Sequence, residues 1–186
     1  MKDIMNKACS FGCIDTVTWL LDNEDHSLFD LKMAMCNTFN SNCLCKEELI
    51  QLLLQKCMVD ELDMEINMNE ACKLGLLKIV TWLIESVDHR LFDLNTAISH
   101  LYLHFTDRNQ QIFKLLLANV SYKLFDLGIV IEQAFRQDLT EILIWLLQTK
   151  DHSLLDVKYV MNEACRVGNL RIIKHVCGTM GKEVFR

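Results

Sequence analysis

The sequence predicts an all-α protein, a helical-repeat solenoid made of similar helix-turn-helix repeats. Three observations indicate this fold class. Tryptophans stand at Trp19, Trp82 and Trp145, 63 residues apart both times. Apolar residues recur at the three-to-four-residue spacing of amphipathic helices, whereas the strict alternation typical of strands is absent. The 186 residues include no proline and only six glycines, so few residues interrupt a helix.

Each 63-residue block contains two repeats, and an aspartate marks every joint between repeats. These residues are Asp30, Asp63, Asp93, Asp126 and Asp156. We therefore expect one domain of six repeats, each 30 or 33 residues long. The repeats are 1–30, 31–63, 64–93, 94–126, 127–156 and 157–186. Such a domain buries a continuous core only by stacking each helical pair on its neighbours.

The first repeat shows the elements that we expect in the others. A first helix ends at Gly12, which the pattern predicts as its C-terminal cap. A second helix follows with the apolar stripe Ile14, Val17, Leu20 and Leu21. The joint aspartates precede each next first helix, and we interpret them as N-caps.

Two further features fix the expected packing. Small residues at Ala8, Ala71, Ala134 and Ala164 favour close approach of helices, and we expect the tryptophans to fill the space between layers. The last repeat has His175 at the tryptophan position, which suits a repeat with one side facing water. The 33-residue repeats carry three extra residues, near Asn40–Lys46 and Phe105–Gln110, where a turn accepts added length.

The third repeat resembles an ankyrin repeat. From Glu70 to Ile84 it reads Glu-Ala-Cys-Lys-Leu-Gly-Leu-Leu-Lys-Ile-Val-Thr-Trp-Leu-Ile, similar to the family core Ala-Ala-x-x-Gly-His-x-x-Ile-Val-x-Leu-Leu-Leu. Ala8–Leu21 and Ala164–Cys177 match this core as well, and Ala134–Leu147 matches it without the glycine. The second and fourth repeats match only in their second helix. The resemblance implies a role in protein recognition and transfers no catalytic residue.

The departures from the ankyrin pattern fall where that family forms its projecting hairpin. Ile66–Asn69 replaces the usual Thr-Pro-Leu-His, and Val87–Asp93 replaces Gly-Ala-Asp-Val-Asn. We therefore expect shortened or missing hairpin fingers on a nearly pure helical scaffold.

Composition narrows the partners. The net charge of −6 argues against a nucleic-acid backbone or an anionic membrane. The N-terminal residues do not resemble a signal peptide, and no apolar run is long enough to cross a bilayer. The nine cysteines are expected to be reduced, with Cys9, Cys72 and Cys165 at one buried repeat position. A cytoplasmic protein is the simplest interpretation, and a nuclear one stays open.

Several motifs invite a chemical interpretation that their context weakens. The pairs Asp25-His26, Asp88-His89 and Asp151-His152 look catalytic, but they recur like a structural joint, and we interpret them as capping or packing motifs. Gly178–Lys182 lacks the spacing of a phosphate loop.

Two sets of residues resemble metal ligands. The second repeat contains Cys36, Cys43, Cys45 and Cys57, of which three at most are expected to converge. His100 and His104 are one helical turn apart, with no third ligand evident. We assign neither a metal nor a cofactor to the chain.

We expect a non-catalytic scaffold that binds another protein. Its candidate partner-binding residues are polar positions on the solvent side of the first helices: Asn6, Lys7, Glu70, Lys73, Glu132, Arg136, Glu163 and Arg166. The chain is expected to be monomeric unless its open ends stack. An alternative is that it forms the recognition segment of a longer repeat array in a larger sensor or scaffold protein. A hydrolytic or metal-dependent enzyme is the remaining, least favoured class.

Overall fold

The computed structural model describes residues 1–101, 106–136, 138–149 and 155–180, and every regular element within them is helical. This confirms the all-α prediction. The α-helices are α1 (Lys2–Phe11), α2 (Ile14–Asn23), α3 (Leu31–Asn40), α4 (Lys46–Lys56), α5 (Met64–Lys73), α6 (Leu77–Ser86), α7 (Leu94–Leu101), α8 (Asp107–Asn119), α9 (Leu127–Arg136), α10 (Thr140–Thr149), α11 (Val157–Val167) and α12 (Leu170–Met180). Short 3-10 helices follow four of the pairs: η1 (His26–Leu28), η2 (Val59–Glu61), η3 (His89–Leu91) and η4 (Tyr122–Leu124).

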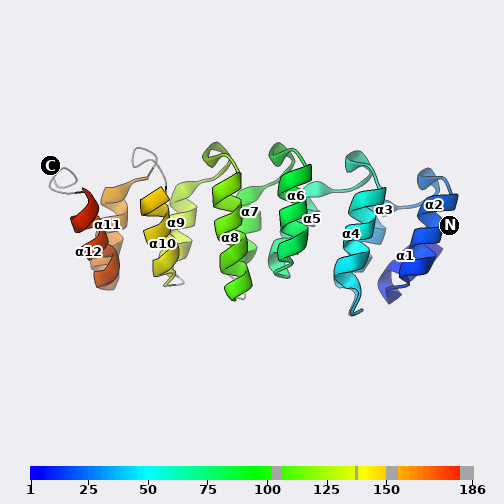
Figure 1. Cartoon of the computed structure of the whole chain (residues 1–186), viewed down its shortest axis with the longest axis horizontal. Coiled ribbons are helices and arrows are strands. Elements are labelled where there is room, and N and C mark those ends of the chain that lie inside the picture. Colours follow the sequence, from blue (N-terminus) through cyan, green and yellow to red (C-terminus); the bar gives the residue numbers. More distant parts are fainter. Residues whose placement is uncertain (102–105, 137, 150–154, 181–186) are drawn as a thin grey trace. The chain divides into compact units, whose positions relative to one another are not determined.

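The chain divides into two compact units, Met1–Asp93 and Leu94–Arg186, each spanning three of the expected repeats. In the N-terminal unit, α1 packs on α3, while α2 and α6 both pack on α4. First helices therefore form one layer and second helices form another, as α1 to α6 show in Figure 1. Within the C-terminal unit the same pattern joins α7, α9 and α11, and separately joins α10 and α12.

The joint aspartates cap the first helices, as the sequence predicts. The Asp30 carboxylate accepts a hydrogen bond from the Met33 backbone N–H, and Asp63 accepts one from Ile66. Asp126 and Asp156 make the equivalent bonds to Ile129 and Tyr159. Each bond satisfies a helix N–H group that has no partner within the helix. These caps fix where α3, α5, α9 and α11 begin.

A left-handed residue ends the first helices. Gly12 adopts φ 72°, and its backbone N–H bonds the Cys9 carbonyl. Gly75 and Gly168 adopt the same conformation at the equivalent place. Where the fifth repeat lacks the glycine, Asp138 takes up φ 53° instead. The turn geometry is therefore retained without glycine, because aspartate tolerates this region better than most residues.

The core consists of the apolar faces of the paired helices. The small positions Ala71, Ala134 and Ala164 are fully buried, which confirms the predicted close contacts at these positions. In α2 the buried residues are Val17, Leu20 and Leu21, the stripe expected from the sequence apart from the half-buried Ile14.

The expectation that the tryptophans fill the interior is wrong. Trp19 is 56% exposed, and Trp82 and Trp145 are half-buried. The reason is helix geometry, since a residue two positions after Val17 is turned by about 200° from it. His175, expected to face water at the same position, is half-buried, and its Nε2 atom has no hydrogen-bond partner in the described residues.

The prediction for the cysteines holds in part. Cys9 and Cys72 are fully buried, each with its thiol directed at the sulfur of a methionine one turn earlier. Cys165, in the last described pair, is exposed.

The extra residues of the second repeat form the turn between α3 and α4, as expected. In the fourth repeat, the expected range Phe105–Gln110 begins outside the described residues. Its remainder contains Thr106, which caps α8 through the Asn109 N–H.

Candidate functional site

Two consecutive joints of the N-terminal unit bring three potential ligand side chains together. His26 opens η1, Cys57 directly follows α4, and Glu61 closes η2. Their ligand atoms lie within 4.8 Å of one another. We call His26, Cys57 and Glu61 the joint cluster. The helical pairs place it by stacking α2 on α4, which sets η1 beside η2.

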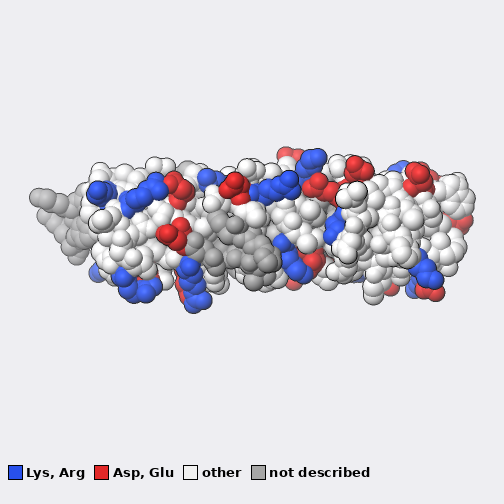
Figure 2. Space-filling view, turned by 90° about the horizontal axis from the view of Figure 1, so that it is seen from below, with Lys and Arg blue, Asp and Glu red and all other residues white. Residues whose placement is uncertain are grey.

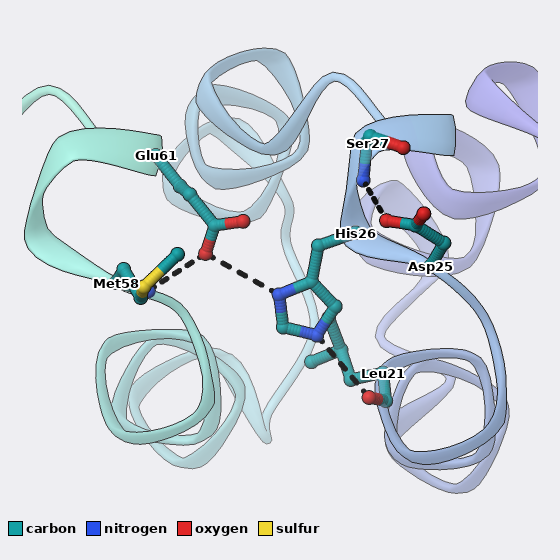
Figure 3. Close-up of polar contacts among 6 residues, drawn as sticks. All are labelled: Leu21, Asp25, His26, Ser27, Met58 and Glu61. Atoms are coloured by element: carbon teal, nitrogen blue, oxygen red, sulfur yellow. Dashed lines mark hydrogen bonds and ion pairs between the residues drawn. The ribbon is translucent and has the colours of Figure 1, made fainter.

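The aspartate of the Asp-His pair supports the joint and does not bind the imidazole. The Asp25 carboxylate accepts a hydrogen bond from the Ser27 N–H at 2.9 Å (Figure 3). That bond is the first cause of the lowered pKa of Asp25. Asp88 caps η3 in the same way through the Arg90 N–H. The interpretation of these pairs as caps is therefore confirmed at both joints, while Asp151 and His152 lie outside the described residues.

The His26 ring is held from both sides. Its Nε2 atom lies 3.2 Å from the Leu21 carbonyl oxygen, and its Nδ1 atom lies 3.3 Å from Glu61 Oε2 (Figure 3). A carbonyl oxygen only accepts hydrogen bonds, so Nε2 must carry the proton in this contact. In the neutral ring, Nδ1 then directs a lone pair at a carboxylate oxygen. That arrangement calls for a cation between the two atoms, whether a proton or a metal ion.

The other two members of the joint cluster are also constrained. Glu61 Oε2 accepts a 2.7 Å hydrogen bond from the Met58 N–H, so the carboxylate is held against its own turn. The side chains of His26 and Glu61 are 24% and 20% exposed, and Cys57 is buried. Burial, followed by the negative charge of Glu61, raises the pKa of the Cys57 thiol to about 12.

The next joint in the chain lacks this chemistry. His89 repeats the position of His26, and its Nε2 atom lies 2.8 Å from the Ile84 carbonyl oxygen. However, 63 residues after Cys57 and Glu61 the sequence has Val120 and Leu124. The joint histidine is thus a repeated structural residue, whereas the thiol and the carboxylate belong to the first joint.

The cysteine set expected in the second repeat does not converge as a group. Cys43 and Cys45 lie close together in the turn before α4, where the Cys45 thiol donates to the Gly12 carbonyl oxygen at 3.2 Å. Cys57 belongs to the joint cluster at the other end of α4. Cys36 lies on α3, near the carboxylates of Asp63 and Glu70, which with burial raise its pKa. Only Cys43 and Cys45 are brought together, and His104 of the other expected pair is outside the described residues.

The candidate partner-binding residues lie on the first helices, as expected, but many pair with each other. Three pairs recur one helical turn apart, Glu70 with Lys73, Glu132 with Arg136, and Glu163 with Arg166, at 2.6 to 2.9 Å. The cations and Lys7 are exposed, whereas the three glutamates and Asn6 are half-buried. The Asn6 side-chain oxygen is itself buried. This flank therefore presents exposed cations beside carboxylates.

An apolar depression lies near the flank in the N-terminal unit. It measures about 500 Å³ and is formed by η2, the start of α5, and Leu91. Val59 and Leu91 are 42% and 47% exposed, although both are apolar. We call it the joint groove, and its lining residues are Lys32, Val59, Asp60, Leu62, Asp63, Met64, Glu65 and Leu91.

The C-terminal unit contains a larger depression, about 610 Å³, at the turns between its helices. Polar groups in its wall bond each other: Arg171 pairs with Glu141, and Asn169 donates to Thr140, both at 2.6 Å. Its polar wall is therefore already paired in part, and the joint groove exposes more apolar surface to a partner.

Charge on the face drawn in Figure 2 is mixed. Basic and acidic side chains alternate there, and the described part of neither unit shows a continuous basic area on this face. A nucleic-acid backbone is recognised by such an area, so this face does not offer that footprint. No helix among the described residues has both the length and the apolar character needed to cross a bilayer.

Sequence reasoning missed the joint cluster because its members are far apart in the chain. A search for ligand spacing considers cysteines near one another, whereas His26 and Glu61 are 35 residues apart. The available signal was the repeat register, which places the ends of consecutive joints side by side. Comparison of the chain with protein-family models, curated proteins and solved structures finds no match.

Proposed function

We propose that the chain is an ankyrin-like helical solenoid that binds a protein partner without catalysis. The observation that carries this proposal is the joint groove, an apolar depression open to solvent on stacked helical pairs. Repeat proteins of this kind build binding surfaces from equivalent positions of successive repeats. The positions that contribute here are the 3-10 helix and the start of the first helix.

The groove favours a partner of particular chemistry. Three carboxylates, those of Asp60, Asp63 and Glu65, surround the apolar residues, against the one ammonium group of Lys32. Opposite charge around an apolar centre supports both orientation and affinity. The preferred partner is therefore a basic segment that presents an apolar side chain beside Lys or Arg.

The exposed flank of the first helices remains a second location for the same function. Its ion pairs are exposed, and such pairs contribute little to stability, about 0–1 kcal/mol. Their charges are consequently available for recognition. The segment-of-a-longer-array interpretation and a cytoplasmic or nuclear location also stay predictions.

Selection from a displayed peptide library, with the purified chain as bait, tests the proposal. Three proteins are compared: the natural chain, a groove variant (Val59→Ser with Leu91→Ser) and a flank variant (Glu70→Lys with Lys73→Glu). The flank variant exchanges the two charges and so preserves the ion pair within α5. Both variants alter exposed or half-buried positions, which limits their effect on folding.

We expect basic, apolar-containing peptides to be enriched by the natural chain and the flank variant, and lost by the groove variant. Loss with the flank variant alone would move the site to the first helices. Failure of all three proteins to enrich any peptide family would contradict a peptide-binding function.

A further inference from the structure

We propose that the joint cluster is a zinc site in which His26 Nδ1, Cys57 Sγ and a Glu61 carboxylate oxygen bind the ion. These three residues combine the imidazole, thiolate and carboxylate ligands that Zn²⁺ accepts in proteins. A thiolate with an imidazole also argues against Mg²⁺ and Ca²⁺, which require oxygen ligands. A water molecule would complete four-coordination.

The distances fit a site that needs little adjustment. Ligands at normal bond lengths in a tetrahedral zinc site are about 3.4–3.6 Å apart. His26 Nδ1 and Glu61 Oε2 are already separated by 3.3 Å. The three ligand atoms all lie within 4.8 Å, so any wider separation to the Cys57 sulfur has to shrink by at most about 1 Å, a shift within reach of side-chain rotation.

The surroundings of the ligands resemble those of metal sites in general. A metal-binding histidine usually donates its second N–H to a carbonyl or a carboxylate, which fixes the ring and its tautomer. His26 has this arrangement, with Nε2 directed at the Leu21 carbonyl oxygen. Glu61 is held in the same manner by the Met58 N–H. Two of the three ligands are therefore oriented before an ion arrives.

The ion would join two successive repeats. His26 lies in the joint after α2, whereas Cys57 and Glu61 lie in the joint after α4. A bond through zinc therefore closes a loop of about one repeat and stabilises the packing of α2 on α4. Because only the folded chain assembles the three ligands, binding also raises the free energy of unfolding.

The chain supplies its own controls. The equivalent positions of the next joint have Val120 and Leu124, so Cys57→Val and Glu61→Leu introduce residues that the repeat already accommodates. His26→Gln and His89→Gln form a matched pair, because both histidines contact the carbonyl oxygen of the residue five positions earlier. Cys43→Ser with Cys45→Ser tests the other close pair of thiols.

The experiment is a titration of the full, reduced chain with Co²⁺, followed by displacement with Zn²⁺ in competition with a chromophoric chelator. We expect one ion per chain, a thiolate-to-cobalt charge-transfer band and the intense visible bands of a tetrahedral site. Cys57→Val and His26→Gln should weaken Zn²⁺ affinity about 100-fold or more, since loss of a ligand exceeds the 10- to 100-fold effect of outer contacts. His89→Gln and the Cys43/Cys45 variant should bind as the natural chain does.

The absence of a tetrahedral cobalt spectrum in the natural chain would overturn the proposal, as would an unchanged spectrum in Cys57→Val. X-ray absorption at the zinc edge gives a readout that needs no variant. It should show one sulfur at about 2.3 Å with nitrogen and oxygen at about 2.0–2.2 Å. Two or more sulfurs would assign the ion to other cysteines and overturn the site.

Discussion

At the scale of single residues, the turn inside each repeat depends on a left-handed backbone and, in the first repeat, on space. A Cβ atom at Gly12 would lie 2.5 Å from Cys43 Cβ and 2.9 Å from Cys45 Sγ. At Gly168, which has the same φ of 72°, a Cβ atom would meet nothing within 4 Å. The two glycines therefore separate the conformational requirement from the steric one.

Alanine at each glycine measures the two requirements. We expect Gly168→Ala to lower the free energy of unfolding by about 1–2 kcal/mol, the penalty of a left-handed residue with a side chain. Gly12→Ala should lower it by a further 1–3 kcal/mol or so, because the neighbouring turn must move. Urea unfolding of both variants measures the difference, and equal losses would show that the α3–α4 turn yields freely.

The two caps Asp25 and Asp88 differ in one neighbour, and this difference predicts a titration. Hydrogen bonds from the Arg90 side chain, then from its backbone N–H, lower the pKa of Asp88 to about 2. Because the folded pKa lies below the ordinary 3.8, the contribution of this carboxylate to stability is present above about pH 4 and is lost as the pH falls towards 2.

Carboxyl NMR titration tests this account of Asp88. Arg90→Gln should raise the pKa of Asp88, though not to its ordinary value, since the backbone N–H still donates. The pKa of Asp25, which has no arginine at the equivalent position, should not change. A pKa of Asp88 that is the same in both proteins would show that the Arg90 contact does not form in solution.

At the scale of helices, buried stripes rather than the most regular residue determine packing. Trp19 gives the repeat its clearest signal in the sequence, yet it is 56% exposed, while Leu20 beside it is 3% exposed. We expect Leu20→Ala to lower the free energy of unfolding by about 2–5 kcal/mol. Trp19→Ala should lower it by less than half as much, because much of that ring already faces water.

Thermal or urea unfolding of the two α2 variants decides between these expectations. A greater loss with Trp19→Ala would place the ring in an interior contact and restore the sequence-based view. Lys56 makes a useful control, since its 2.6 Å ion pair with Asp22 is largely exposed. Lys56→Met should change the free energy of unfolding by no more than about 1 kcal/mol.

The helices and their starts were predictable from the sequence because the information is local. The spacing of Val17, Leu20 and Leu21 already indicates the inner face of α2, and Asp30 marks where α3 begins. The regularity of the tryptophans misled, because recurrence shows that a position is repeated and not that it is buried. The joint cluster was missed because its thiol and carboxylate occur in one joint only, and register alone brings His26 to them.

At the scale of the whole molecule, packing between neighbouring pairs makes stability local. Helix α4 contacts α2, α3 and α6 within the N-terminal unit, and Leu53 on α4 is fully buried. In an array of this type, a local defect acts mainly on the adjoining elements. We expect Leu53→Ala to increase amide hydrogen exchange in α4 and in those three helices.

Hydrogen exchange with mass spectrometry measures the spread of this effect. Peptides from α11 and α12 should exchange as in the natural chain. A uniform increase across all peptides would instead indicate one cooperative transition for the entire chain. Peptides that cover α1 provide an intermediate case, since α1 packs on α2 and α3.

The hydrogen bonds between successive repeats also bear on how the chain folds during synthesis. Gly12 is bonded by Cys45 and Asp22 by Lys56, while His26 contacts Glu61, over sequence separations of 33, 34 and 35 residues. Each repeat therefore gains its next-repeat partner once about one more repeat has left the ribosome. Contacts this short-ranged favour rapid folding and release the chain from any need to wait for its C-terminus. The nascent protein consequently exposes, at any moment, little more than its newest helical pair.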